Sequence, residues 1–249
     1  MKLLLTIIAV ALPILGLLHY IYSHNKFKPE PIRMLFLTFL AGIVGGVLSS
    51  FFGRYVGTVD IYTTHPDSLM DYVYLTLFEA IPDECLKLLV LCLVIRPNRF
   101  FDEFIDGIVY AVCISLGFVF AENVIHLSFI TEHWYETSVY RSFFILPGSL
   151  ACGILMGYFY SRIHFKPSAR PVHWLFVLGI PILCHSFCNI VVLLYDRIDG
   201  NSFFDGYPLM FCLVGCTLAI LYFVHRLIDK QLERDLKRSD TTTPDKRWK

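Results

Sequence analysis

The sequence contains few charged residues. Asp, Glu, Lys and Arg make up 17% of its 249 residues, where a soluble domain typically carries about 25%, while 56% of the residues are apolar. The formal net charge is zero, so the basic excess typical of nucleic-acid-binding domains is missing. This composition excludes a disordered chain and a nucleic-acid-binding protein as leading interpretations, and we expect no nucleic-acid partner.

Loop cysteines, long linkers and internal repeats are also missing. All eight cysteines fall inside apolar runs, which argues against a secreted scaffold held together by disulfides. The apolar runs are continuous and do not show the alternation that lipid-facing strands require. We therefore expect one helical domain over residues 1–249.

Seven apolar segments are present, each of about 20–27 residues, which is long enough for a helix to cross the hydrocarbon core of a bilayer. They run from Leu3 to Tyr22, Ile32 to Phe52, Leu69 to Ile95, Ile105 to Ile130, Tyr140 to Tyr160, Val172 to Tyr195 and Tyr207 to Leu227. The sequence thus predicts an all-α, polytopic transmembrane helix bundle of seven spans, embedded in the lipid bilayer as a single integral-membrane domain.

The basic residues predict the orientation of the spans. Sixteen of the 21 Lys and Arg residues lie in alternate connecting segments and in the carboxyl-terminal tail. Because basic segments tend to stay in the cytoplasm, the amino terminus is expected outside and the carboxyl terminus inside. Residues 228–249 then form a basic cytoplasmic tail, and the protein is a multi-pass component of the plasma or inner membrane.

Ionisable residues interrupt the third span, where each costs about 2.5–3.5 kcal/mol if it lies at mid-membrane. Glu79, Asp83 and Lys87 are spaced four residues apart, so they share one helix face, with Glu84 beside them. Pro82 interrupts the backbone hydrogen bonds just before the acidic pair. Such residues mark a functional site by default, although a structural ion pair that includes Lys87 is the simpler alternative.

Two further spans carry polar residues at helical spacing. The fourth contains Glu122 and Asn123, and the sixth contains His185 and Asn189, which are four residues apart. Counting residues from the span ends places Glu84, Glu122 and His185 at similar depth, so we expect these side chains to meet in one pocket open to the outer side. Hydrolysis and proton-coupled transport both use such groups, and the residues alone do not choose between them.

The order of these motifs resembles the PrsW family of intramembrane proteases, which is related to the CAAX-prenyl proteases and bacteriocin-immunity membrane proteins. The resemblance covers about residues 78–194 and includes four motifs. They read Asp83-Glu84-x-x-Lys87, then Gly117-Phe118-x-x-Ala121-Glu122-Asn123, then Gly148-Ser149, and finally His185-x-x-x-Asn189.

This resemblance implies peptide-bond hydrolysis within the membrane. A carboxylate activates a water molecule, which is the role expected of Glu84, with Asp83 sharing the proton. Glu122 is expected to be the second essential carboxylate, and His185 or Asn189 is expected to stabilise the developing oxyanion. Lys87 is expected to balance charge, and Asn123 and Asn189 to position other groups by hydrogen bonds. Glu79 and Ser149 are further supporting residues.

The involvement of a metal is open at this point. Glu84, Glu122 and His185 form a ligand set that a divalent ion such as zinc can use, with one position left for water. The chain contains no HExxH motif, so it lacks the common metalloprotease helix.

Two departures from the family pattern bear on activity. Asp83 stands where the family usually has Glu, which shortens the side chain by one methylene and keeps its chemistry. Ser149 stands where the family has His, which removes an imidazole. The resemblance implies a membrane-protein substrate, of which a single-span anti-sigma factor is the best-known kind. The alternatives are a catalytically inactive relative that acts as a membrane scaffold, and a proton-coupled transporter.

Overall fold

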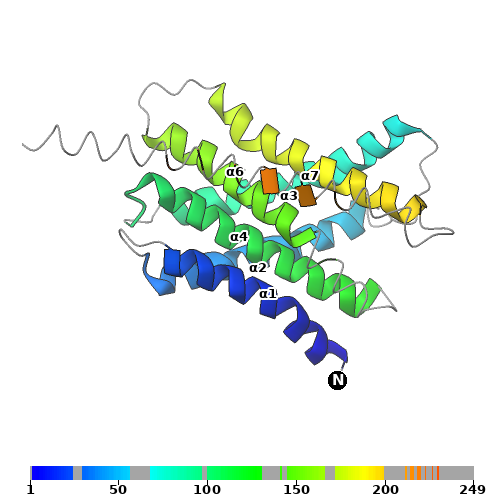
Figure 1. Ribbon diagram of the computed structural model, residues 1–249, viewed down its shortest axis with the longest axis horizontal. Helices are drawn as coiled ribbons and strands as arrows, with labels where there is room; N and C mark the ends of the chain where they lie inside the picture. The colour runs from blue at the N-terminus through cyan, green and yellow to red at the C-terminus, as the bar shows by residue number, and fades with distance from the viewer. Residues whose placement is uncertain are drawn as a thin grey trace, which may run out of the picture.

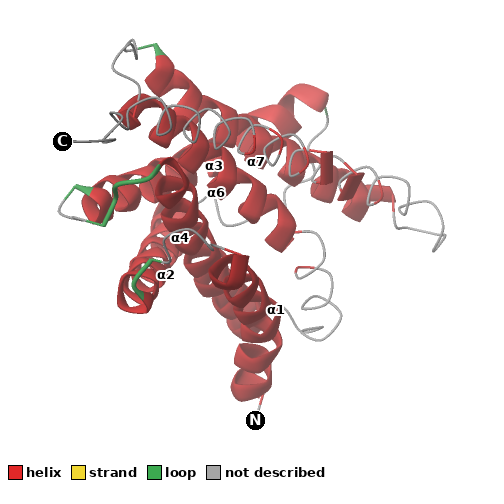
Figure 2. Cartoon of the chain, turned by 60° about the vertical axis from the view of Figure 1, so that its left-hand side comes forward, coloured by secondary structure: helices red, strands yellow, loops and turns green. Residues whose placement is uncertain are grey.

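The computed structural model describes residues 2–24, 30–56, 68–96, 100–130, 145–165 and 172–198, with Arg141 and eight isolated positions between 211 and 229. Regular structure in this part of the chain is helical, and the described residues include no strand (Figure 2). The helices are α1 (Lys2–His24), α2 (Ile32–Val56), α3 (Leu69–Ile95), α4 (Phe104–Ile125), the π-helical turn η2 (His126–Ile130), α6 (Leu146–Phe165) and α7 (His173–Ile198).

The predicted spans agree closely with these helices, apart from the fifth. That span was predicted to begin at Tyr140, whereas α6 begins at Leu146 and continues to Phe165. Arg141 and Ile145, which precede α6, are in π-helical conformation, so they too are helical. The seventh predicted span, Tyr207 to Leu227, lies outside the described residues except for isolated positions.

In the part of the chain that the structure describes, three helices are long and apolar enough to cross a membrane by length and composition, over Ile32–Phe52, Phe104–Ser128 and His173–Leu194. The prediction of an all-helical architecture with membrane-spanning helices is therefore confirmed for the described residues. Seven spans, and the sides on which the termini lie, stay predictions.

Helix α4 occupies the centre of the bundle. It packs against α1 and α2 on one side and against α6 on the other (Figure 1). Helix α7 packs against both α6 and α3. Every residue from Asp106 to Val119 is buried. A helix that is apolar on all sides is expected in such a position, because it has no face suited to water.

Small residues allow the neighbours of α4 to approach its backbone closely. A side chain on Gly42 or Gly46 of α2 would overlap backbone carbonyl oxygens of α4, and one on Gly117 would overlap the carbonyl oxygen of Phe39. On the other side of α4, Gly153 and Gly157 of α6 make similarly close contacts. Gly42 and Gly46 are four residues apart on α2, and Gly153 and Gly157 are four residues apart on α6. This is the small-xxx-small spacing that brings membrane helices together.

The outer faces of the bundle are apolar. Large side chains are exposed along α2, α3 and α7, among them Phe36, Phe51, Leu93, Leu175 and Leu183. A continuous apolar exterior of this kind is unusual for a soluble protein and suits contact with lipid chains.

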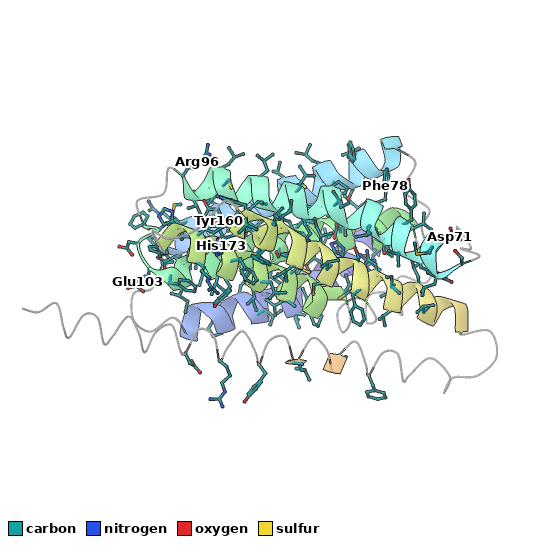
Figure 3. All side chains as sticks on the ribbon, turned by 90° about the horizontal axis from the view of Figure 1, so that it is seen from above. Asp71, Phe78, Arg96, Glu103, Tyr160 and His173 are labelled. Carbon is teal, nitrogen blue, oxygen red and sulfur yellow. The ribbon has the colours of Figure 1, made fainter. Side chains whose placement is uncertain are left out.

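Consecutive helices run in opposite directions along the bundle. Arg96 at the end of α3, Glu103 at the start of α4 and His173 at the start of α7 lie toward one end, and Asp71 in the first turn of α3 lies at the other (Figure 3). Ser68 caps α3, and its hydroxyl accepts a hydrogen bond from the backbone N–H of Asp71. This arrangement brings the middle of α3, the second half of α4 and the middle of α7 to similar heights in the bundle.

Replacing Gly117 by Ala is expected to lower the free energy of unfolding by about 1–3 kcal/mol, because the added methyl group overpacks the α2–α4 crossing. The measurement is thermal unfolding of the purified protein in detergent. Gly179→Ala is the control, since a Cβ at Gly179 meets nothing within 4 Å. Equal stability of the two variants would contradict the close crossing.

Candidate functional site

The charged residues in the middle of α3 are directed into the bundle. The side chains of Asp83, Glu84 and Lys87 are buried, and Glu79 is half-buried one turn earlier. A charge facing lipid is costly, so an interior position with partners from other helices is the favourable arrangement.

Glu84 is at the centre of this group. Its Oε1 accepts a hydrogen bond from Lys87 Nζ at 2.7 Å and lies 3.0 Å from Nδ1 of His185, which comes from α7. The Lys87 ammonium also lies 4.7 Å from the centre of the Phe118 ring on α4. Residues from three helices that are distant in sequence, α3, α4 and α7, are therefore brought together here.

The second carboxylate oxygen of Glu84 has a different environment. Oε2 is buried and has no hydrogen-bond partner among the described residues. Unsatisfied buried oxygens are rare, because they lose their hydration without replacement. This oxygen is therefore available to a group that the protein does not itself supply.

The other polar residues form separate pairs around Glu84. Asp83 faces α2, where it accepts a hydrogen bond from the hydroxyl of Ser49. Glu79 accepts a hydrogen bond from Nδ2 of Asn189 at 2.8 Å, which links α3 to α7 a second time. The two adjacent carboxylates, Asp83 and Glu84, therefore have different immediate partners.

A pocket with an empty volume of about 350 Å³ lies beside this network. Its polar lining comes from Lys87 of α3, Glu122 of α4, Ser149 of α6, and His185 and Asn189 of α7. Five of the predicted site residues thus line one pocket, and Glu84 contacts two of them. Glu79, Asp83 and Asn123 are not part of the lining and bind elsewhere in the network.

Arg141, which was not among the predicted site residues, joins the polar network. Its side chain is buried, and its Nε donates a hydrogen bond to Oδ1 of Asn123. It also interacts electrostatically with Glu79 and Glu122. Little in the sequence signalled this role, because Arg141 lies at the start of the fifth predicted span, where a basic residue is ordinary.

The proposed metal ligands do not form a metal site as they are arranged. Oε1 of Glu84 is bound by the Lys87 ammonium, and Nδ1 of His185 points to that same oxygen, so Glu84 offers only Oε2. The ammonium 2.7 Å from Oε1 also weakens the attraction of this carboxylate for a divalent ion. In the part of the chain that the structure describes, no three His, Cys, Asp or Glu side chains form a group that can hold a metal.

The lipid-facing helices and the buried polar pocket define an integral-membrane helical protein with an intramembrane site. The sequence model of a family described as "PrsW family intramembrane metalloprotease" matches residues 30–224. The chain therefore belongs to the PrsW family, a family of intramembrane proteases, as its motifs predicted.

Curated relatives agree with this assignment. The chain is 27% identical to the protease PrsW of Bacillus subtilis over 183 residues, covering 72% of this chain and 79% of that protein. It is 30% identical to the protease PrsW of Oceanobacillus iheyensis over 180 residues, with the same coverage, and 26% identical to that of Clostridioides difficile over 201 residues, covering 79% and 82%. No solved structure gives a significant match.

Replacing Lys87 by Met is expected to lower the free energy of unfolding by about 3–5 kcal/mol, because it removes the ammonium partner of a fully buried carboxylate. The double variant Lys87→Met/Glu84→Gln should recover part of this loss, since the uncompensated charge is then absent. The free energy of unfolding of the single and the double variant is measured in detergent. Arg96→Met, at an exposed position at the end of α3, is the control. If Lys87→Met were as stable as Arg96→Met, the result would contradict a stabilising ion pair between Lys87 and Glu84.

Proposed function

We propose that this protein is an endopeptidase that cuts a single-span membrane protein within the bilayer, near the extracytoplasmic face. The observation that carries the proposal is the contact of Glu84 with His185 beside a pocket inside a lipid-facing bundle. An anti-sigma factor is the kind of substrate that the family resemblance suggests. The plasma membrane as location, seven spans and an external amino terminus belong to the same proposal.

His185 and Glu84 are arranged to activate water together. An ionised Glu84 accepts a hydrogen bond from the N–H at Nδ1 of His185, which holds the proton on Nδ1 and leaves Nε2 of the neutral imidazole unprotonated and basic. His185 lines the pocket, so Nε2 is the atom that takes a proton from a water molecule held there. Glu84 thus acts as the base through the imidazole, whose orientation and tautomer it fixes.

The charged groups around the pocket serve the remaining steps. The water oxygen attacks the peptide carbonyl, and the ammonium of Lys87 balances the negative charge that develops on the carbonyl oxygen. Glu122 accepts a hydrogen bond from the attacking water and holds it in place. The C–N bond then breaks as His185 returns the proton to the departing amine.

The neighbouring polar residues support this arrangement. Asp83 interacts electrostatically with Glu122 and His185, so it shares in the charge and proton balance of the site. Asn189 restrains Glu79, and Arg141 restrains Asn123 next to Glu122. Removing one of these groups should therefore weaken activity less than removing Glu84 or His185.

The variants Glu84→Gln, Glu122→Gln and His185→Ala are each expected to abolish cutting, because each removes a group that handles the water or its proton. The measurement is the appearance of truncated product when a candidate single-span protein is co-expressed with the enzyme, at matched membrane levels. Asp102→Asn is the control, since it makes the same acid-to-amide change at an exposed position.

Full cutting by Glu84→Gln would refute its assignment as the base. Substrate-dependent proton flux without any cut product would instead identify a transporter. Normal assembly of wild type without product or flux would identify an inactive scaffold.

Cutting by the purified enzyme is expected to continue at an unchanged rate after dialysis against a chelator, because the candidate ligand Glu84 is bound to an ammonium and to His185. The rate with a purified substrate in detergent and the metal content of the same sample are measured together. Loss of activity that added zinc restores would overturn this expectation and support the metal dependence named in the family description.

A further inference from the structure

The side chains that line the pocket are of two chemical kinds. One kind comprises the charged and amide side chains of the proposed catalytic groups. The other consists of small or apolar residues of α4, α6 and α7 and the segment before α6; these are Val119, Ile145, Gly148, Ser149, Cys152 and Cys188. We call this second group the small-residue wall.

The polar atoms of the small-residue wall are engaged by the backbone. The hydroxyl of Ser149 donates a hydrogen bond to the carbonyl oxygen of Ser115 at 3.3 Å, and the thiol of Cys152 contacts the carbonyl oxygen of Pro181 at 3.6 Å. Both donors are therefore satisfied within the protein. What they present to the pocket is van der Waals surface, which favours an apolar occupant.

The size of this wall is set by short side chains. Gly148 lies against Cys188, and a Cβ on Gly148 would come within 3.1 Å of the Cys188 sulfur. Bulkier residues at these positions would fill the pocket. Cys188 follows His185 by three residues on α7, so both lie on the same side of the helix and the wall adjoins the reacting imidazole.

We propose that the small-residue wall is the side-chain subsite of this enzyme, and that it selects a substrate with a small or medium apolar residue flanking the cut bond. Ser149 and Cys152 set the upper limit of that residue's size. This inference rests on the proposed function, because it assigns a substrate preference to the same pocket. The serine in place of the family's histidine then widens the subsite at a position without a charged role here.

The test uses single-span reporter proteins whose cut bond has been mapped by mass spectrometry. The two residues flanking that bond are replaced in turn by Ala, Val, Leu, Phe and Trp, and kcat/KM is measured for each reporter with the full-length enzyme in detergent. At one flanking position, kcat/KM should fall at least tenfold from Val to Trp, since a small excess in side-chain size is strongly discriminated by a closed pocket.

Two enzyme variants should move this limit in opposite directions. Ser149→Leu narrows the subsite and should lower kcat/KM for the Leu reporter about tenfold relative to the Ala reporter. Cys152→Ala widens the subsite, so kcat/KM for the Phe reporter, divided by kcat/KM for the Val reporter, should rise about tenfold. Each ratio is taken within one preparation, so it does not depend on the amount of folded enzyme.

Matched controls make the same chemical changes away from the pocket. Ser50 of α2 is half-buried, and its hydroxyl bonds to its own helix at Gly46, so Ser50→Leu controls for Ser149→Leu. Cys113 of α4 is buried and does not line the pocket, so Cys113→Ala controls for Cys152→Ala. Neither control should change the reporter ratios.

Each outcome has a distinct meaning. Opposite shifts in the two pocket variants, with unchanged controls, support the subsite. Ratios that stay the same in both variants, or that change equally in the controls, overturn the subsite and leave the proteolytic function intact. Absence of cutting by wild-type enzyme on every reporter overturns the proposed function and the subsite with it. Should Ser149→Leu not fold, Cys152→Ala alone decides between the first two results.

Discussion

The structure depends on a carboxylate and an ammonium that are buried together between apolar helices. Glu84 is inaccessible to solvent, and Lys87 lies one turn away on the same helix at 2.7 Å. Neither charge is stable alone in such surroundings, because desolvation outweighs any gain that an isolated ion makes. The pair also brings in His185 of α7, so charge balance on α3 determines which face of α7 is turned inward. The candidate site is a consequence of that requirement.

Close packing around α4 makes the position of this pair reproducible. Glycines on both neighbouring helices allow backbone-to-backbone contact, which limits how far α2 and α6 can slide along α4. Because α2 supplies Ser49 and α6 supplies one wall of the pocket, the same contacts fix the surroundings of Asp83 and the width of the pocket. Glycine spacing far from the polar residues therefore controls the geometry of the site.

The pocket separates two tasks that a protease inside a membrane must combine. Some of the lining side chains are charged or amide groups, and ion pairs and hydrogen bonds compensate the buried charges beside them. The small-residue wall hides its polar atoms in bonds to backbone carbonyls, so an apolar substrate segment meets no unsatisfied group there. Under the proposed function, a transmembrane substrate would leave lipid for a surface of similar polarity while its peptide bond approaches His185.

Composition and periodicity determined the helical membrane architecture, because only long apolar segments with internal hydrogen bonds are stable in lipid. The motifs identified the family and brought forward Glu84, Glu122 and His185, since ionisable residues inside apolar spans are conspicuous. Only the tertiary structure decided how they pair. Asp83 and Glu84 are adjacent in sequence, but successive helical positions point about 100° apart, so one meets Ser49 on α2 and the other His185 on α7. Arg141 joined the network for the same reason, since the packing of distant segments, and not their spacing along the chain, sets which charges compensate each other.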